Sequence, residues 1–218
     1  MKRFSTLLLA AGLLLPGSSA SAQTTFSLHG GLNLSIIRDY HVDSLLVLNR
    51  ERATGPNVGL AATFRVSPPD QVNSLALQLS GTYSRRGGAR SLGQKITTRL
   101  DYVEIAALLD VRIPLIWEPL AVHVSAGGAA GRLMSCEFEF QDAEGRTERT
   151  SACADDEFRS LDFGLVGGGS LEIGATERLG VTIGFQYYHG LGFIDHFEEG
   201  SLKNRSLSLR VGLLYPIG

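Results

Sequence analysis

Apolar and polar residues alternate along residues 161–188. Leucine, isoleucine, valine and aromatic side chains occupy most odd positions, and glycine or polar side chains occupy most even ones, on both sides of a short polar break at 174–178. A period of two predicts β-strands with one apolar and one polar face. The short break predicts a β-hairpin, and each arm has the length of about ten residues with which a tilted strand crosses a bilayer.

The same pattern recurs in six further stretches and predicts eight strands in all. The predicted strands are 25–35, 57–66, 73–85, 97–113, 120–134, 161–173, 179–188 and 204–215. The connections alternate in length, and the predicted long ones are 36–56, 86–96, 135–159 and 189–203. Short periplasmic turns alternating with longer extracellular loops are typical of outer-membrane barrels. We therefore predict an all-β fold, an eight-stranded antiparallel up-and-down transmembrane β-barrel.

The polar faces of the predicted strands carry charged side chains, which we expect to point into the lumen. They are Arg65, Glu104, Asp110, Arg112, Asp162, Glu172 and Arg210. The interior of an eight-stranded barrel is just wide enough for side chains to fill it. Unpaired buried charge is costly, so we interpret these residues as a lumen network of ion pairs and hydrogen bonds. A narrow path for ions or protons is the alternative.

The start of the chain has the features of a secretory signal peptide. Two basic residues follow the first methionine, an apolar run covers residues 7–15, and small residues end at Ala22. We predict that residues 1–22 are a signal peptide and that residues 23–218 are the outer-membrane β-barrel domain. The signal, the alternating loop lengths and the small, glycine-rich polar faces favour a lipid-facing barrel over a soluble barrel that lines a ligand cavity with apolar residues. The expected location is the bacterial cell outer membrane.

Two cysteines, Cys136 and Cys153, lie in the same predicted loop. An exported protein meets an oxidising compartment, which favours a disulfide between them over two free thiols. In the chain-entropy model a bridge that closes a loop of this size stabilises the fold by about 3 kcal/mol. The bridge would hold the loop and not the barrel wall.

Composition excludes some partners. Without the two basic residues of the signal peptide, 18 Lys and Arg stand against 22 Asp and Glu, a net charge near −4. This weak acidity argues against nucleic acid as a partner. Acidic groups gather in the predicted loops, but none has the spacing of an EF-hand, so we expect no metal and no cofactor.

One pair of residues has the spacing of a catalytic pair. His123 and Ser125 lie two residues apart on one strand face, as a general base beside its nucleophile requires, and a His-x-Ser pair resembles outer-membrane lipid hydrolases and deacylases. Both side chains are expected to point inward, near a periplasmic turn and away from lipid. We therefore expect that the protein is not an enzyme, and we keep the lipid hydrolase as an alternative.

Six segments carry a resemblance to a known family. They are LHGGLNLS (28–35), LQLSGTYSRRG (77–87), LDYVEIAALLDVRI (100–113), LDFGLVGGGSLEI (161–173), LGVTIGFQYYHGL (179–191) and NRSLSLRVGLLYPIG (204–218). They resemble the Bacteroidota-type outer-membrane β-barrel domain family, often described as PorT-like. The resemblance covers the mature chain and implies a membrane barrel; one subfamily is linked to protein secretion and gliding machinery. Its motifs are strand patterns and not catalytic signatures.

These observations together predict a structural or interaction role through long extracellular loops, above a lumen filled with side chains. The expected partners are outer-membrane lipid and an unidentified extracellular or periplasmic protein, and the expected state is a monomer. The alternatives are the lipid hydrolase with its His-x-Ser pair and a small-solute channel.

Overall fold

The computed structural model describes residues 24–39, 49–67, 73–92, 94–117, 119–141, 146–151, 158–176, 179–195 and 202–217. The predicted signal peptide lies outside these residues. The strands are β1 (Thr24–Asp39), β2 (Asn49–Arg65), β3 (Ser74–Leu92), β4 (Gln94–Pro114), β5 (Leu120–Gln141), β6 (Thr147–Ser151), β7 (Leu161–Thr176), β8 (Leu179–Gly190) and β9 (Leu202–Ile217). The described residues include no helix that is long and apolar enough to cross a membrane.

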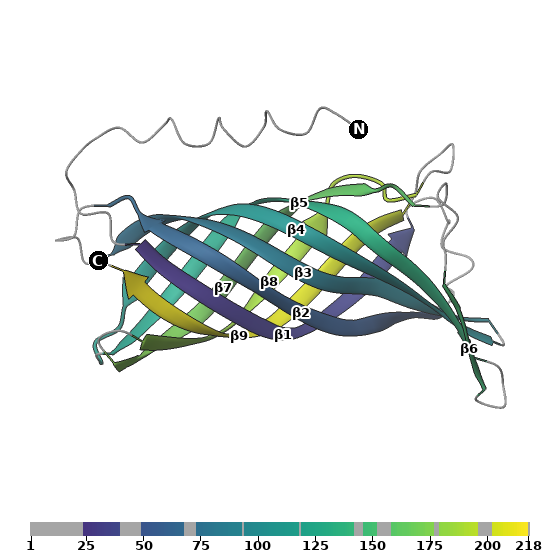
Figure 1. The fold of residues 1–218 in the computed structure, drawn as a ribbon, viewed down its shortest axis with the longest axis horizontal. Coiled ribbons are helices and arrows are strands. Elements are labelled where there is room, and N and C mark those ends of the chain that lie inside the picture. Colours follow the sequence, from purple (N-terminus) through teal and green to yellow (C-terminus); the bar gives the residue numbers. More distant parts are fainter. Residues whose placement is uncertain are drawn as a thin grey trace, which may run out of the picture.

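Eight of these strands form a closed ring. The order is β4-β3-β2-β1-β9-β8-β7-β5, and a further pairing of β4 with β5 completes the circle. All pairings are antiparallel, and β1 joins β9 along its whole length of 16 residues. Strand β6 pairs only with residues 137–141 of β5 among the described strands. The predicted eight-stranded up-and-down barrel is therefore confirmed, with one short strand added outside the ring (Figure 1).

The two ends of the barrel differ. At one end, called the turn end here, lie the start of β1, the end of β9 and the short connections β2–β3, β4–β5 and β7–β8. The other end, the loop end, carries the remaining connections and β6, and Figure 1 shows β6 opposite the C-terminus. Here β2 to β6 continue past the ring as a projecting sheet, made of residues 49–52, 88–92, 94–99 and 137–141 together with β6.

The outer face of the barrel is apolar. Leu60 and Ile105 are exposed by 65% and 69%, and neighbouring strands present similar side chains, including Phe26, Leu28, Leu77, Leu79, Leu209, Val211 and Leu213. The alternate positions point inward, where Asn33, Ser84 and Asp162 are buried. A water-soluble protein rarely exposes a contiguous apolar belt of this kind. The arrangement is that of a barrel whose exterior contacts lipid, as the alternation predicts.

Strands extend further than predicted at the loop end. Residues 49–56, assigned to a loop, belong to β2, and most of the predicted loop 86–96 continues the β3–β4 ladder. The predicted loop 135–159 contains the end of β5 and all of β6. The cause is the change of solvent, because past the membrane neither strand face needs to be apolar. The period of two therefore fades although backbone pairing continues.

Apolar side chains close the loop end from inside. Ile194, which follows β8, is fully buried against Leu100 and Tyr102 on β4. Its backbone nitrogen donates to the carbonyl of Leu202 at 2.8 Å, and its carbonyl accepts from the Arg159 nitrogen at 2.7 Å. The chain after β8 thus folds over the mouth of the barrel and is held there by backbone hydrogen bonds.

Crowding inside the ring gives a first test. A Cβ added to Gly59, which faces the lumen, would lie 2.7 Å from both His29 Nε2 and Thr82 Oγ1 and 2.6 Å from the Gly81 carbonyl oxygen, whereas a Cβ on Gly81 meets nothing within 4 Å. We expect Gly59→Ala to destabilise the barrel by about 1–3 kcal/mol because it overpacks the interior. The measurement is the urea midpoint of folding into phospholipid vesicles.

The matched control is Gly81→Ala on the adjoining strand. It adds the same methyl group on the open side of the wall and should leave the midpoint close to that of the native sequence. Equal midpoints for the two variants would show that the lumen is not tightly packed at Gly59.

Candidate functional site in the barrel lumen

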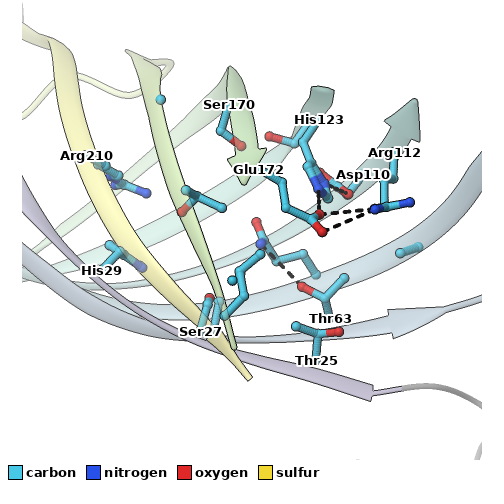
Figure 2. Close-up of a pocket in the computed structure, with 18 of the residues that line it drawn as sticks. Thr25, Ser27, His29, Thr63, Asp110, Arg112, His123, Ser170, Glu172 and Arg210 are labelled. Atoms are coloured by element: carbon cyan, nitrogen blue, oxygen red, sulfur yellow. Dashed lines mark hydrogen bonds and ion pairs between the residues drawn. The ribbon is translucent and has the colours of Figure 1, made fainter. Parts of the chain in front are cut away.

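A first charged network lies in the turn-end half of the lumen. His123 on β5 has both ring nitrogens beside carboxylates: Nδ1 is 2.8 Å from Asp110 Oδ1, and Nε2 is 2.6 Å from Glu172 Oε2. Arg112 donates to both oxygens of Glu172, at 3.1 and 3.2 Å. Figure 2 shows these four side chains converging from β4, β5 and β7. Ionised carboxylates only accept hydrogen bonds, so the doubly protonated imidazole satisfies both contacts and leaves the group neutral overall.

A second network fills the loop-end half and is centred on Arg86 of β3. The buried guanidinium forms ion pairs with Glu104 of β4 and with Asp162 of β7, the latter at 3.4 Å. Its central carbon lies 3.6 Å from the ring centre of Tyr188 and 5.5 Å from that of Tyr102, which is cation–π geometry. We call these five residues the Arg86 plug, because they block the lumen below Ile194.

Amide and hydroxyl groups tie the Arg86 plug to the wall. Asn204 Nδ2 lies 2.9 Å from Asp162 Oδ2 and 3.2 Å from the Tyr102 hydroxyl. Asn33 Nδ2 donates to Ser84 Oγ at 3.0 Å, and its oxygen accepts from Ser208 at 3.1 Å. The Asn204 contacts tie the plug to β9, and the Asn33 contacts join β1 to β3 and β9 within the wall.

A cavity of about 350 Å³ occupies the turn-end half. Its lining includes turn-end residues such as Thr25, Ser74 and Pro216, so the cavity opens at that end, and it reaches inward to His29 and Arg210. Between Arg210 and Arg86 the described residues surround a void of about 20 Å³. The lumen is thus hollow in one half and closed in the other. The expectation of a lumen filled with side chains does not hold for the turn-end half, because many of the residues that line it are serine, threonine, glycine or alanine.

All seven charged residues named from the sequence lie on inward strand positions. The structure brings five of them into networks: Asp110, Arg112 and Glu172 around His123, and Glu104 and Asp162 around Arg86. The other two, Arg65 and Arg210, line the cavity and form no ion pair with a described residue. The predicted set is thus divided between two networks and two separate arginines.

Sequence reasoning missed Arg86, the centre of the second network. The predicted strand ends at Arg85, and the following run Arg86-Gly87-Gly88 was assigned to a loop because it is polar and rich in glycine. The alternation of strand faces was the available signal. Even-numbered positions of this strand point inward from Ser74 through Arg86. Tyr102 and Tyr188 were missed for a related reason: they are aromatic residues on inward positions, where polar ones were expected.

His123 and Ser125 do not form a catalytic pair in this structure. Both nitrogens of His123 are engaged by carboxylates, and within the described residues no hydrogen bond joins the two side chains. A general base needs a nitrogen directed at its nucleophile. Both residues line the aqueous cavity, away from the lipid-facing surface.

Several predicted groups lie outside the described residues. Cys153 is one of them, so the bridge from Cys136 on β5 stays a prediction. The same holds for the acidic clusters at 41–43, 155–157 and 196–199. In the part of the chain that the structure describes, no three or more His, Cys, Asp or Glu side chains are grouped to hold a metal ion.

The fold and its faces define a class: a transmembrane β-barrel with an apolar outer belt and a charged, hydrogen-bonded interior. Comparison with known families agrees. Residues 19–196 match the model of the outer membrane protein beta-barrel domain, and the chain belongs to that family. It is accordingly a protein of the bacterial outer membrane. A comparison with curated proteins finds no match.

Solved structures that are similar to this chain include the following three. Ail of Yersinia pestis is 15% identical, with 89% of this chain and 99% of Ail covered and a TM-score of 0.41. Neisserial surface protein A is 13% identical, with 87% and 96% covered and a TM-score of 0.46. OprG of Pseudomonas aeruginosa is 11% identical, with 90% and 97% covered and a TM-score of 0.46.

The Arg86 plug gives a second test. Arg86→Met would leave two carboxylates, Glu104 and Asp162, buried without their cation, and removing one partner of a buried ion pair costs about 3–5 kcal/mol. We expect the free energy of unfolding in vesicles to fall by that amount.

The neighbouring arginine supplies the control. Arg85 points to the outside of the same strand, and its side chain is 32% exposed where it pairs with Asp101 at 2.7 Å. Exposed ion pairs contribute about 0–1 kcal/mol. This pair is bidentate and Asp101 is 13% exposed, so Arg85→Met should cost more than that but less than Arg86→Met, which leaves two buried carboxylates without a cation. Similar losses for the two variants would show that the interior ion pairs of Arg86 stabilise the barrel no more than the outer ion pair of Arg85.

Proposed function

We propose that this protein is a non-conducting outer-membrane barrel that acts through the surface at its loop end. The observation that carries the proposal is the contrast between the two ends. The lumen is closed below the loop end by the Arg86 plug, and the wall continues past that closure as the projecting sheet. The loop end is placed on the cell exterior in this proposal because outer-membrane barrels keep short turns in the periplasm.

The lengths of the strands support a role for the projecting sheet. Strands β3, β4 and β5 have 19, 21 and 22 residues, whereas about 9–11 suffice to cross a bilayer. Backbone pairing between neighbouring strands holds the sheet, and two ion pairs cross it, Lys95–Glu51 at 2.5 Å and Arg99–Glu139 at 2.7 Å. An ordered sheet presents a fixed pattern of side chains to a partner. Such preorganisation lowers the entropy lost on binding.

Closure of the lumen argues against the channel alternative. A solute passing from the cavity would have to displace Arg86 from two carboxylates and two aromatic rings, and then Ile194 above them. The hydrolase alternative requires a His123 nitrogen free to activate Ser125, and both nitrogens are occupied. We therefore propose binding at the loop end as the role, without catalysis and without a cofactor.

The finer family assignment belongs to the same proposal. We place the chain with the PorT-like barrels on the strand motifs that it shares with them. We propose that it is a monomer surrounded by outer-membrane lipid and that its partner is a protein, which remains to be identified. Nucleic acid is not proposed because the chain is acidic overall.

Conductance tests the closed lumen. The protein reconstituted into planar bilayers should give no stepwise current, because the Arg86 plug occupies the loop-end half and the void beside it measures about 20 Å³. A double variant, Arg86→Gly with Tyr188→Ala, removes the centre of the plug and should raise conductance if it folds, as judged by heat-modifiable migration on gels. Stepwise current from the native sequence would contradict the proposal.

Labelling tests the orientation on which the function depends. Glu148 on β6 is exposed at the loop end, and Ile116 is almost fully exposed at the turn end. On intact cells a membrane-impermeant maleimide should label Glu148→Cys, and should label Ile116→Cys only after the outer membrane is permeabilised. The native sequence measures the background from Cys136 and Cys153.

A photoreactive amino acid at the same two positions then tests the interaction. Adducts with another protein should form from position 148 on intact cells and not from position 116. Adducts from the turn end alone would place the interaction on the other side of the membrane and overturn the proposed role.

A further inference from the structure

The turn-end cavity carries a net positive charge. Its two acidic lining residues, Asp110 and Glu172, are already bound by His123 and Arg112. Two further arginines, Arg65 and Arg210, line the same cavity, and neither forms an ion pair with a described residue. The hollow half of the lumen therefore holds two cationic groups that its own carboxylates do not neutralise.

Arg210 is the deeper of the two. Its side chain enters the lumen from β9, and its Nε atom is buried with no hydrogen-bond partner. Glu104, which borders the small void above Arg210, is held in an ion pair by Arg86. Arg210 as a whole is half-buried, but a buried N–H donor without a partner is unfavourable, and an anion that enters the cavity would accept a hydrogen bond from it and balance the positive charge.

The surroundings of Arg210 suit a polar anion. Figure 2 shows Arg210 and His29 on one wall, across the cavity from the His123 network. Gly31, the register partner of Arg210 on β1, lies two residues from His29. Hydroxyl and amide groups such as Ser27, Gln78 and Gln186 line the remaining space. Oxygen atoms of an anion would find hydrogen-bond donors on several strands.

We propose that the turn-end half of the lumen binds a small oxyanion, a phosphate or carboxylate group, with Arg210 as its principal ligand. Arg65, the last residue of β2, attracts the anion at the entrance of the cavity. A volume of about 350 Å³ is at the small end of the range for ligand sites and excludes large solutes. The anion comes either from a free solute or from the headgroup of a lipid at the turn end. This site lies on the other side of the plug from the surface proposed above, and its occupancy does not depend on that surface.

Titration calorimetry on the folded protein in an uncharged maltoside detergent tests the site. One arm adds inorganic phosphate, a second adds succinate, and a third adds a short-chain phosphatidylglycerol. Saturable binding of phosphate or succinate identifies a free solute as the source, and binding of the lipid alone identifies the headgroup. Absence of binding in all three arms would overturn the proposal.

Substitutions locate the site. Arg210→Gln should weaken binding at least tenfold, and Arg65→Gln should weaken it less. The control Arg132→Gln changes an exposed arginine on the outer face of β5 and should leave binding unchanged. Binding that persists in Arg210→Gln would show that the anion sits elsewhere.

A measurement on the native sequence covers the case in which Arg210→Gln does not fold. Phenylglyoxal modifies accessible arginines, and mass spectrometry reports each site. The anion that binds should protect Arg210 and leave Arg132 reactive. Equal protection or equal reaction at both arginines would count against the site.

Discussion

Closure of the hydrogen-bonded ring is the constraint on which the rest of this structure depends. Lipid offers no partner to an open strand edge, so every strand in the membrane must pair on both sides. The pairings β1–β9 and β4–β5 meet this requirement here. A ring of eight strands is narrow, and half of all strand residues must point into it. The contents of the lumen are therefore set by which residues occupy the inward positions.

The two halves of the lumen meet that constraint in different ways. In the loop-end half, large side chains fill the space, and Tyr102, Tyr188 and Arg86 leave room for little else. In the turn-end half, positions such as Ser27, Ser80 and Ser170 are small, and a cavity results. Charge follows the same division. Buried carboxylates are paired in both halves, whereas the arginines without ion pairs line the hollow one, where water or a ligand solvates them.

The sequence specifies much of this arrangement, for a physical reason. Because side chains alternate exactly along a strand, membership of the apolar face decides which charged residues face inward, as for Glu104 and Asp162. The same alternation places His123 and Ser125 inside the barrel and away from lipid. The strand count and the fold follow from the recurrence of the pattern and from the alternating loop lengths.

The features that the sequence did not predict depend on the register between strands and on the solvent around each strand. The alternation of apolar and polar residues carries information about neither. Arg86 was placed in a loop because its strand leaves the membrane there and loses its apolar face. Its contact with Asp162 joins residues 76 apart, a pairing that the ring fixes and the local sequence does not indicate. The same limit applies to His123, whose two carboxylate partners come from different strands. The cavity forms where small residues of several strands lie at the same height along the barrel axis, and the local sequence does not indicate that height.

The closed middle of the lumen also decides how the two ends relate. An open pore would let events at one end act on the other by direct passage of a solute. Here the Arg86 plug separates the cavity from the projecting sheet, and the wall between them is a closed sheet with backbone hydrogen bonds on both sides of each strand. Coupling between distant sites needs an element with two alternative arrangements. The described strands form one continuous wall that shows no such element, so ligand in the cavity and partner on the projecting sheet should bind independently, as two separate sites on one support.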